Sequence, residues 1–216
     1  MKRTKISFVG EKPIFTGSPQ IVPGGFNLDR EKQRFSVGDI IPAGTLAIFD
    51  EVTRKVQIVK TAKVKAIGST KDKKVITLYS NGYCSPCFSV GDKLLQAKSV
   101  SGTFEDAPSI VSIEKPGVSN APYVITLSAE ISGLAVDDVL VEVVESSTNA
   151  AVIGEPNSLT IEEVTVKEFE TAIDVTEDTM QYAVMERRVL PIPDSMKDST
   201  KRYLKANSHI RLSQTY

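Results

Sequence analysis

Two cysteines, in Cys84-Ser85-Pro86-Cys87, form the one pair of residues whose spacing is typical of a chemical motif. Such a pair supplies half of a tetrahedral zinc site, but the chain has no third cysteine and a single histidine. A redox pair needs its first thiol at a helix N-terminus, where the thiol pKa falls, and here the cysteines lie between two β-like segments. We therefore expect a structural loop, with an intersubunit metal site and a redox pair as the alternatives.

The other titratable residues do not form a recognisable site. We expect the single histidine, His209, at the surface or in an interface, not as a catalytic base. Asp137-Asp138 and Glu162-Glu163 are adjacent pairs, and adjacent side chains of a strand face opposite sides of a sheet. No glycines have the spacing of a phosphate-binding loop. We assign no catalytic, cofactor-binding or metal-binding residue, and we predict that the chain is not an enzyme and needs no cofactor.

Composition narrows the class of protein. The 216 residues, 41% hydrophobic and 25% charged, can bury one sizeable core or two small ones. No run of about 18 apolar residues occurs, so we expect no membrane span. The residues after the basic start Met1–Lys5 are too polar for a signal peptide, so we expect no export. The basic residues are dispersed without an aromatic-interleaved arginine patch, so we expect no nucleic-acid partner.

The chain repeats two short phrases. Phe35–Asp39 (Phe-Ser-Val-Gly-Asp) returns unchanged as Phe88–Asp92, and a looser copy is Leu134–Asp138. Val-Ile-Thr-Leu precedes the last two copies, as Val75–Leu78 and Val124–Leu127. Glycine tolerates positive φ and aspartate bonds its own backbone, so Gly-Asp separates two extended segments. The repeated order of strand, loop, tight turn and strand predicts a duplicated β module.

These patterns predict a mainly β fold with duplicated small β-barrel or sandwich modules, an irregular N-terminal arm and a short C-terminal helix. Period-two alternation predicts a meander over 35–67, and strands, with a short helix as the alternative, over 158–190. After Pro193, an apolar face at helical spacing predicts a helix that ends near Asn207. The expected domains are a 1–34 arm, a 35–99 first β module, a 100–109 linker, a 110–157 second β module and a 158–216 C-terminal β segment with the helix.

Charge is unevenly distributed along the chain. Residues 130–180 contain 13 acidic residues and one lysine, whereas residues 181–216 contain seven basic and three acidic residues. Residues 1–129 then carry a net charge of +7 within an overall charge of −1. Solvated faces are one interpretation of this asymmetry. The other is contact between oppositely charged parts of neighbouring copies.

Two ends of the chain resemble a known family. Phe35–Ala47 is similar to segments of tailed-phage head decoration and head-fiber proteins. Glu186–Pro193, followed by Ile210–Tyr216, is similar to structural proteins of phages and prophages of gut bacteria. The resemblance implies a virion protein on the capsid surface, made in the host cytoplasm, that binds the major capsid protein and self-associates, often as a trimer. The duplicated middle departs from small single-domain decoration proteins.

Other classes of protein stay open. A phage tail or baseplate subunit cannot be separated from a head protein on this pattern. A non-viral β-rich binding module, for example one that binds carbohydrate, is a second alternative, although the absence of Trp argues against a sugar-binding platform. An enzyme that uses the cysteine pair is the third.

Overall fold

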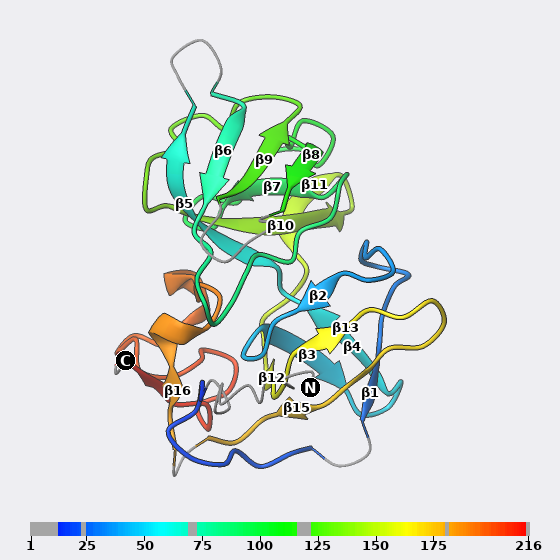
Figure 1. The fold of residues 1–216 in the computed structure, drawn as a ribbon, viewed down its shortest axis with the longest axis vertical. Helices are drawn as coiled ribbons and strands as arrows, with labels where there is room; N and C mark the ends of the chain where they lie inside the picture. Colours follow the sequence, from blue (N-terminus) through cyan, green and yellow to red (C-terminus); the bar gives the residue numbers. More distant parts are fainter. Residues whose placement is uncertain (1–12, 23–24, 69–72, 116–121, 180–181, 215–216) are drawn as a thin grey trace, which may run out of the picture.

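The computed structural model describes residues 13–22, 25–68, 73–115, 122–179 and 182–214. It is mainly β, as predicted, with 39% strand and 3% helix. Figure 1 shows two β units, one containing the middle of the chain and the other containing both its early and its late parts. The chain passes from the lower unit into the upper one after β4 (Lys55–Ile58) and returns after β11 (Asn149–Val152). We call the region where the two units meet the junction.

The lower unit in Figure 1 is built around a six-stranded sheet. Its order is β14 (Ala172–Ile173), β1 (Phe26–Leu28), β4 (Lys55–Ile58), β3 (Leu46–Asp50), β12 (Ser158–Thr160) and β15 (Val175–Thr176). Two short ladders accompany it, β2 (Ile40–Ile41) with β13 (Val164–Thr165) and β16 (Val184–Met185) with β17 (Leu212–Ser213). Early and late segments therefore share one sheet, and the strands expected within 158–190 are confirmed.

The upper unit is a seven-stranded sheet that curls into a nearly closed barrel. Its order is β11 (Asn149–Val152), β10 (Val139–Ser146), β5 (Thr61–Ile67), β6 (Val75–Leu78), β9 (Tyr123–Leu127) and β8 (Ile110–Glu114), and β7 (Lys93–Gln96) pairs with β10. A bridge between Lys93 and Ser109 brings β7 to β8 and closes the circuit.

The sequence repeat is visible in the order of the barrel elements. β5, β6, a tight turn and β7 are followed by β8, β9, a second tight turn and β10. The two Val-Ile-Thr-Leu phrases pair directly with each other as β6 and β9, with Ile76 opposite Ile125. β7 pairs with β10 in the same way. The duplicated units are thus interlocked halves of one barrel.

This arrangement corrects the expected division of the chain. Residues 35–99 and 110–157 do not form two separate modules, because pairing across the repeat places the strands of both in one sheet. Residues 100–109 are not a linker either: Thr103 bridges to Asn149, and Ala107 is buried in a core cluster. The boundary lies instead at residue 60, between β4 and β5, and near the return segment that follows β11.

Alternating burial explains the strands. β4, β6 and β7 each alternate half-buried and buried residues, and β9 begins and ends on buried ones. This two-residue period places one apolar face toward a core. One cluster fills the barrel, with Phe88, Leu94 and Tyr123 among its members, and a second fills the lower unit around Phe26 and Ile41.

A third cluster joins the units. It combines Val141 and Val143 of the barrel strand β10 with Leu159 of the lower sheet and Ile192 and Ile210 of the C-terminal segment. All five side chains are buried. The C-terminal segment therefore packs across the junction and helps to fix the two units relative to each other.

Over the described residues, the expected N-terminal arm packs against other segments of the same chain. Phe15 bridges to Val184 and Gln20 to Asp178, and β1 pairs with both β14 and β4. Phe15 and Phe26 are buried in two of the cores. Residues 1–12 and 23–24 of the expected arm lie outside the described residues.

The expected C-terminal helix is wrong. Over the described residues, helix is limited to two 3₁₀ turns, η1 (Glu186–Arg188) and η2 (Asp194–Met196). The Asp198 carboxylate accepts the backbone N–H groups of Arg202 and Tyr203 at 2.9 and 3.0 Å, and Lys201 adopts a φ of 57°. Aspartate competes with the helical backbone in this way. A tight turn therefore replaces the helix. Of the residues at the predicted helical spacing, Met196 and Leu204 are buried whereas Thr200 is exposed.

Candidate functional site

The three repeated phrases form the same tight turn. In Ser36–Asp39, Ser89–Asp92 and Ala135–Asp138, the first carbonyl accepts the N–H of the aspartate at 3.0, 3.1 and 3.2 Å. The aspartate carboxylate in return accepts the N–H of the first residue at 2.7, 2.8 and 2.8 Å. The third residue has a φ of 90°, 90° and 72°, the positive value that this turn requires.

Each of these aspartates also pairs with a lysine from a distant part of the chain. The oxygen-to-Nζ distances are 2.7, 2.7 and 2.6 Å for the pairs Asp39–Lys115, Asp92–Lys60 and Asp138–Lys98. The aspartate carboxylate of each turn therefore accepts a backbone N–H of the same turn and also pairs with a lysine ammonium. A charged partner strengthens such hydrogen bonds.

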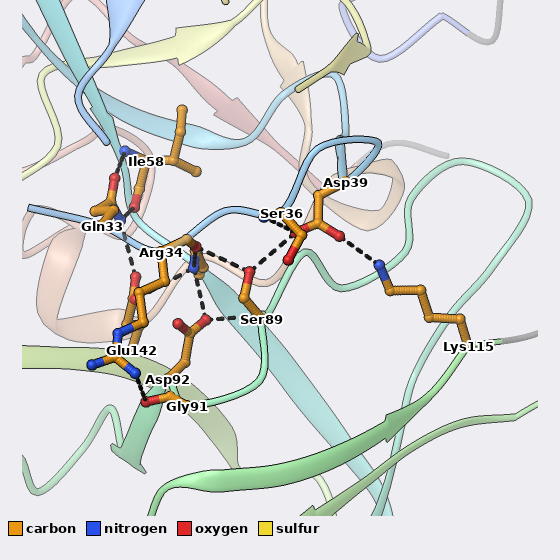
Figure 2. A network of polar contacts seen from close by, with 11 residues as sticks. Gln33, Arg34, Ser36, Asp39, Ile58, Ser89, Gly91, Asp92, Lys115 and Glu142 are labelled. Carbon is orange, nitrogen blue, oxygen red and sulfur yellow. Dashed lines mark hydrogen bonds and ion pairs between the residues drawn. The ribbon is translucent and has the colours of Figure 1, made fainter. Parts of the chain in front are cut away.

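The first two turns meet at the junction of the two units (Figure 2). The Ser89 hydroxyl donates to the Asp39 carboxylate at 3.2 Å, and it is also within 3.0 Å of the Arg34 carbonyl. The Arg34 guanidinium reaches the Gly91 carbonyl at 3.5 Å. One turn belongs to the lower unit and the other to the barrel, so these contacts cross between them.

Lys60 lies at the centre of the junction, where the chain passes from β4 into β5. Its side chain is 0% exposed. The ammonium donates to the Asp92 carboxylate at 2.7 Å and the Arg34 carbonyl at 2.6 Å, and lies 3.4 Å from a Glu142 oxygen. It also lies 4.2 Å from the centre of the Phe35 ring. A buried ammonium requires such partners, because desolvation of an unpaired charge is costly.

Gln33 connects this cluster to the end of β4. Its side-chain amide donates to the Ile58 carbonyl at 2.5 Å and accepts the Ile58 N–H at 2.6 Å, as a neighbouring strand would. The same amide nitrogen donates to the second Glu142 oxygen at 2.9 Å. Figure 2 shows Gln33, Asp92 and Glu142 converging from different segments. Both Glu142 oxygens are therefore engaged on the barrel side of the junction.

Burial and charge set the protonation of the cluster. Burial raises the pKa of Glu142 to about 7, and the Asp92 charge adds to this effect although Lys60 opposes it. Burial disfavours the Lys60 ammonium, but the charges of Glu142 and Asp92 outweigh it and raise the lysine pKa. Lys60 therefore stays protonated, and Glu142 is the carboxylate that takes up a proton most readily.

At the edge of the cluster, the hydrogen bond from Lys115 and the Ser36 N–H lower the pKa of Asp39, although burial opposes them. Burial raises the pKa of the Cys87 thiol to about 12, so that this thiol is protonated at neutral pH. A protonated thiol and a protonated lysine are both poor nucleophiles. The arrangement is suited to holding two β units together.

Two buried polar atoms near this cluster have no hydrogen-bond partner among the described residues, Asp92 Oδ1 and the Tyr123 hydroxyl. Burial and the charges of Cys87, Asp39 and Asp92 raise the pKa of the Tyr123 hydroxyl, so it too is protonated. Unsatisfied buried groups raise the energetic cost of the junction.

The two cysteines differ in burial. Cys87 is buried in the lower core, whereas Cys84 packs against the same core, is half-buried and lines a surface pocket. A shared site on a symmetry axis would need both thiols at the surface, and Cys87 is not there. The expectation of a structural loop fits this placement.

The other candidates lie apart. His209 is exposed, with Nδ1 3.7 Å from an Asp178 oxygen. Asp137 and Asp138 lie in the turn before β10, and they pair with different lysines, Asp137 with Lys63 at 2.7 Å and Asp138 with Lys98 at 2.6 Å. Glu162 and Glu163 lie outside the junction cluster. Among the described residues no group of three or more His, Cys, Asp or Glu side chains is placed to hold a metal ion.

Sequence reasoning missed the buried charges at the junction. Lys60 is in phase with the inward residues Ile58, Ala62 and Val64, which was a usable signal of burial. Glu142 is in phase with Leu140, which is buried in the barrel core. A charged residue in the inward phase of an apolar strand predicts a buried ion pair, but its partner cannot be identified from spacing.

Comparisons with known proteins do not extend this picture: no family model, no curated protein and no solved structure matches the chain. In the part of the chain that the structure describes, no helix has the length and apolar character to cross a bilayer.

Proposed function

We propose that the chain is a structural protein of a bacteriophage virion. In this proposal it is an auxiliary protein, a decoration protein or head fiber, that binds the major capsid protein on the capsid surface and self-associates, with a trimer expected. It is not an enzyme, needs no cofactor, and has no nucleic-acid or membrane partner. The proposal rests on the resemblance of the two chain ends and on the character of the junction.

The junction is the observation that carries the proposal. Its ionisable side chains pair with one another inside the chain, Lys60 with both Asp92 and Glu142, and all three side chains are buried. Such a cluster specifies the relative position of the two β units. A rigid two-unit body loses little conformational entropy on binding, which suits a protein that repeats one contact many times over a particle.

Apolar side chains around the junction support a contact role. Val37 and Val90 occupy the same position in the two adjacent turns and are 60% and 58% exposed. Val111 of β8 is also exposed, and the neighbouring Ile110 carbonyl accepts the Gly91 N–H at 2.8 Å. Exposed apolar side chains that gather in one region are typical of protein contact sites.

Localisation of the chain on purified particles tests the proposal. Particles released by cells that carry the coding sequence are imaged by cryo-electron microscopy with antibody fragments raised against the chain. Antibody on the head surface is the expected result, and antibody on the tail would favour the tail or baseplate alternative. Particles that lack the chain by mass spectrometry would overturn a virion role.

A matched pair of variants tests the contact. Val90→Asp in the junction turn should weaken binding to capsids that lack the chain, because a carboxylate cannot be desolvated at an apolar contact. Val136→Asp places the same charge at the same position of the third turn, where Val136 is 52% exposed. Equal binding by both variants and the unmodified chain would exclude this surface from the contact.

A further inference from the structure

The loop after β13 displays an aromatic side chain. Phe169 is 85% exposed and lies between two exposed glutamates, Glu168 and Glu170. Folding normally removes a side chain of this size from water, so a phenylalanine held at this exposure is a candidate anchor for a partner.

The structure fixes this loop at both ends. The buried Thr171 hydroxyl accepts the Lys167 N–H at 2.9 Å, and the Thr171 carbonyl accepts the Leu28 N–H at 2.9 Å. The Arg30 guanidinium donates to the carbonyls of Lys167 and Glu168 at 3.2 and 2.9 Å. The loop is thus ordered before any partner arrives, which lowers the entropic cost of binding.

A pocket of about 480 Å³ lies where the barrel meets the C-terminal segment. Tyr79 of the barrel and the apolar run Val189–Ile192 form part of its wall, and Cys84 lines it as well. The volume falls in the range of about 300–1,000 Å³ that is usual for ligand pockets. One aromatic ring can therefore enter with room for its neighbours.

The charged residues of the pocket wall are mainly cationic. Lys63 lies 5.3 Å from the centre of the Tyr79 ring and also pairs with Asp137, and Arg187 lies nearby in the lining. The third charged member of the wall, Glu186, pairs with Lys197 just as Lys63 pairs with Asp137, so the wall carries one cation more than it carries carboxylates. The wall thus presents apolar surface with cations, the complement of a phenylalanine flanked by two glutamates.

We propose that Phe169 of one copy of the chain enters this pocket on a second copy, with Glu168 and Glu170 directed at Lys63 and Arg187. The inference deepens the self-association part of the proposed function and rests on it, but it does not depend on capsid attachment. A small molecule or a different protein in the pocket is the competing outcome.

The contact has consequences for assembly. Donor loop and acceptor pocket are different surfaces, so the contact is heterologous and closes a ring when the rotation permits. A single aromatic side chain buries about 150–250 Å². A stable interface buries about 1,600 Å² in total, so Phe169 is the anchor of a larger contact.

Cross-linking through Cys84 tests the contact. Glu170→Cys, which keeps the Phe169 ring, is treated with a short bis-maleimide, and Cys84 in the pocket is the second thiol because Cys87 is buried. Covalent oligomers are expected on a denaturing gel, and they should disappear in Glu170→Cys with Cys84→Ser. Val52→Cys is the control, since Val52 is 92% exposed on a different turn.

Cross-links at equal yield from Val52→Cys would overturn the proposed geometry. Oligomers in solution without a Glu170→Cys to Cys84 cross-link would overturn it while leaving self-association intact. A strictly monomeric chain at high concentration would exclude both the proposed contact and self-association. None of these results bears on capsid attachment, which the particle experiments test separately.

Solution affinity supplies an independent measurement. Phe169→Ala should weaken self-association by about tenfold or more in sedimentation equilibrium, as expected for loss of an aromatic anchor. Val52→Ala should leave it unchanged. Alkylation of Cys84 should slow as the concentration of the unmodified chain rises, and not for Phe169→Ala. Equal affinity of Phe169→Ala and the unmodified chain would overturn the proposal.

Discussion

The turns at Ser89–Asp92 and Ala135–Asp138 have the same backbone geometry in opposite surroundings. In both, the aspartate carboxylate accepts the N–H three residues earlier at 2.8 Å and pairs with a lysine. Lys60, the partner of the first turn, is 0% exposed, whereas the side chain of Lys98, the partner of the second, is 59% exposed. The motif sets the shape of the chain, and burial sets how much the motif stabilises the fold.

The largest effect is expected at the buried turn. Lys60→Met removes the cation and leaves Asp92 as a buried charge without its lysine, while Glu142, whose pKa Lys60 no longer lowers, takes up a proton. Breaking a buried ion pair by loss of one member costs about 3–5 kcal/mol. Urea unfolding should therefore show a lower midpoint with little change in slope.

A triple variant is the control for this prediction. Lys60→Met with Asp92→Asn and Glu142→Gln removes all three charges together and should recover most of the lost stability, because replacing a whole buried ion cluster is often close to neutral. If the triple variant is no more stable than the single one, shape and not charge decides the cost.

The next effect concerns pH and should separate the two turns. The pKa of Glu142 is raised in the folded chain from 4.5 to about 7, so folding favours the protonated form. Its stabilising contribution is fully present below pH 4.5 and is lost as pH rises through about 7. The shift corresponds to about 3 kcal/mol at most. Stability should fall between about pH 5 and pH 8, measured by urea unfolding at each pH.

Glu142→Gln should abolish this slope, because the amide does not titrate. The exposed turn contributes with the opposite sign: its Lys98 hydrogen bond, opposed by burial, lowers the pKa of Asp138, so that stabilisation is lost only as pH falls into the acid range. A flat profile for the unmodified chain from pH 5 to pH 8, or an unchanged slope in Glu142→Gln, would contradict the assignment.

A smaller effect is expected at the third position of each turn. Gly91→Ala must adopt a φ of 90°, at a cost of about 1–2 kcal/mol, and its Cβ would lie 2.4 Å from the Arg34 guanidinium nitrogen. Gly38→Ala carries the backbone cost alone, since no atom of the described residues lies within 4 Å of the added Cβ. Gly91→Ala should therefore unfold at slightly lower urea than Gly38→Ala.

Asp137→Gly is the reverse change in the exposed turn, where Asp137 already has a φ of 72°. Glycine adopts this conformation without strain, although the Lys63 pair is lost. We expect a change within about 0.5 kcal/mol, as for an ordinary surface substitution. A loss as large as that of Gly91→Ala would mean that the side chain, not the backbone, holds this turn.

The same contrast explains what the sequence could predict. Turns and strands depend on residues that are neighbours in the chain. The Val-Gly-Asp phrases predicted the turns and the period-two alternation predicted the strands, and the structure contains both at the predicted positions. The interlocking of the barrel halves is not local: β6 pairs with β5 of its own half on one side and with β9 of the other half on the opposite side, and the order of the strands along the chain does not specify the second pairing. The prediction of a helix near 194–207 was wrong for a different local reason, because the Asp198 side chain accepts hydrogen bonds from the backbone and forms a turn.

The ion pairs of the junction could not be predicted from the sequence, because they too join residues that are distant along the chain. The inward phase of Lys60 was visible, but its partner Asp92 is 32 residues away and Glu142 is 82 residues away. Three carboxylates sit in identical turns, and the repeat alone does not say which one meets the buried lysine. Solvent exposure, a property of the whole fold, separates the Lys60 pair from the Lys98 pair.

A similarly small effect is expected for Lys98→Met in the exposed turn. Asp138 keeps the Ala135 N–H at 2.8 Å and gains water in place of the ammonium, so no charge is left buried without a partner. Surface ion pairs contribute about 0–1 kcal/mol. Since salt screens exposed charges and the screening length falls to about 3 Å at 1 M, the difference from the unmodified chain should vanish at high salt. Lys60→Met should keep its full cost there. A Lys98→Met loss of about 3 kcal/mol, insensitive to salt, would show that the turn motif itself and not its burial determines the energy of the pair.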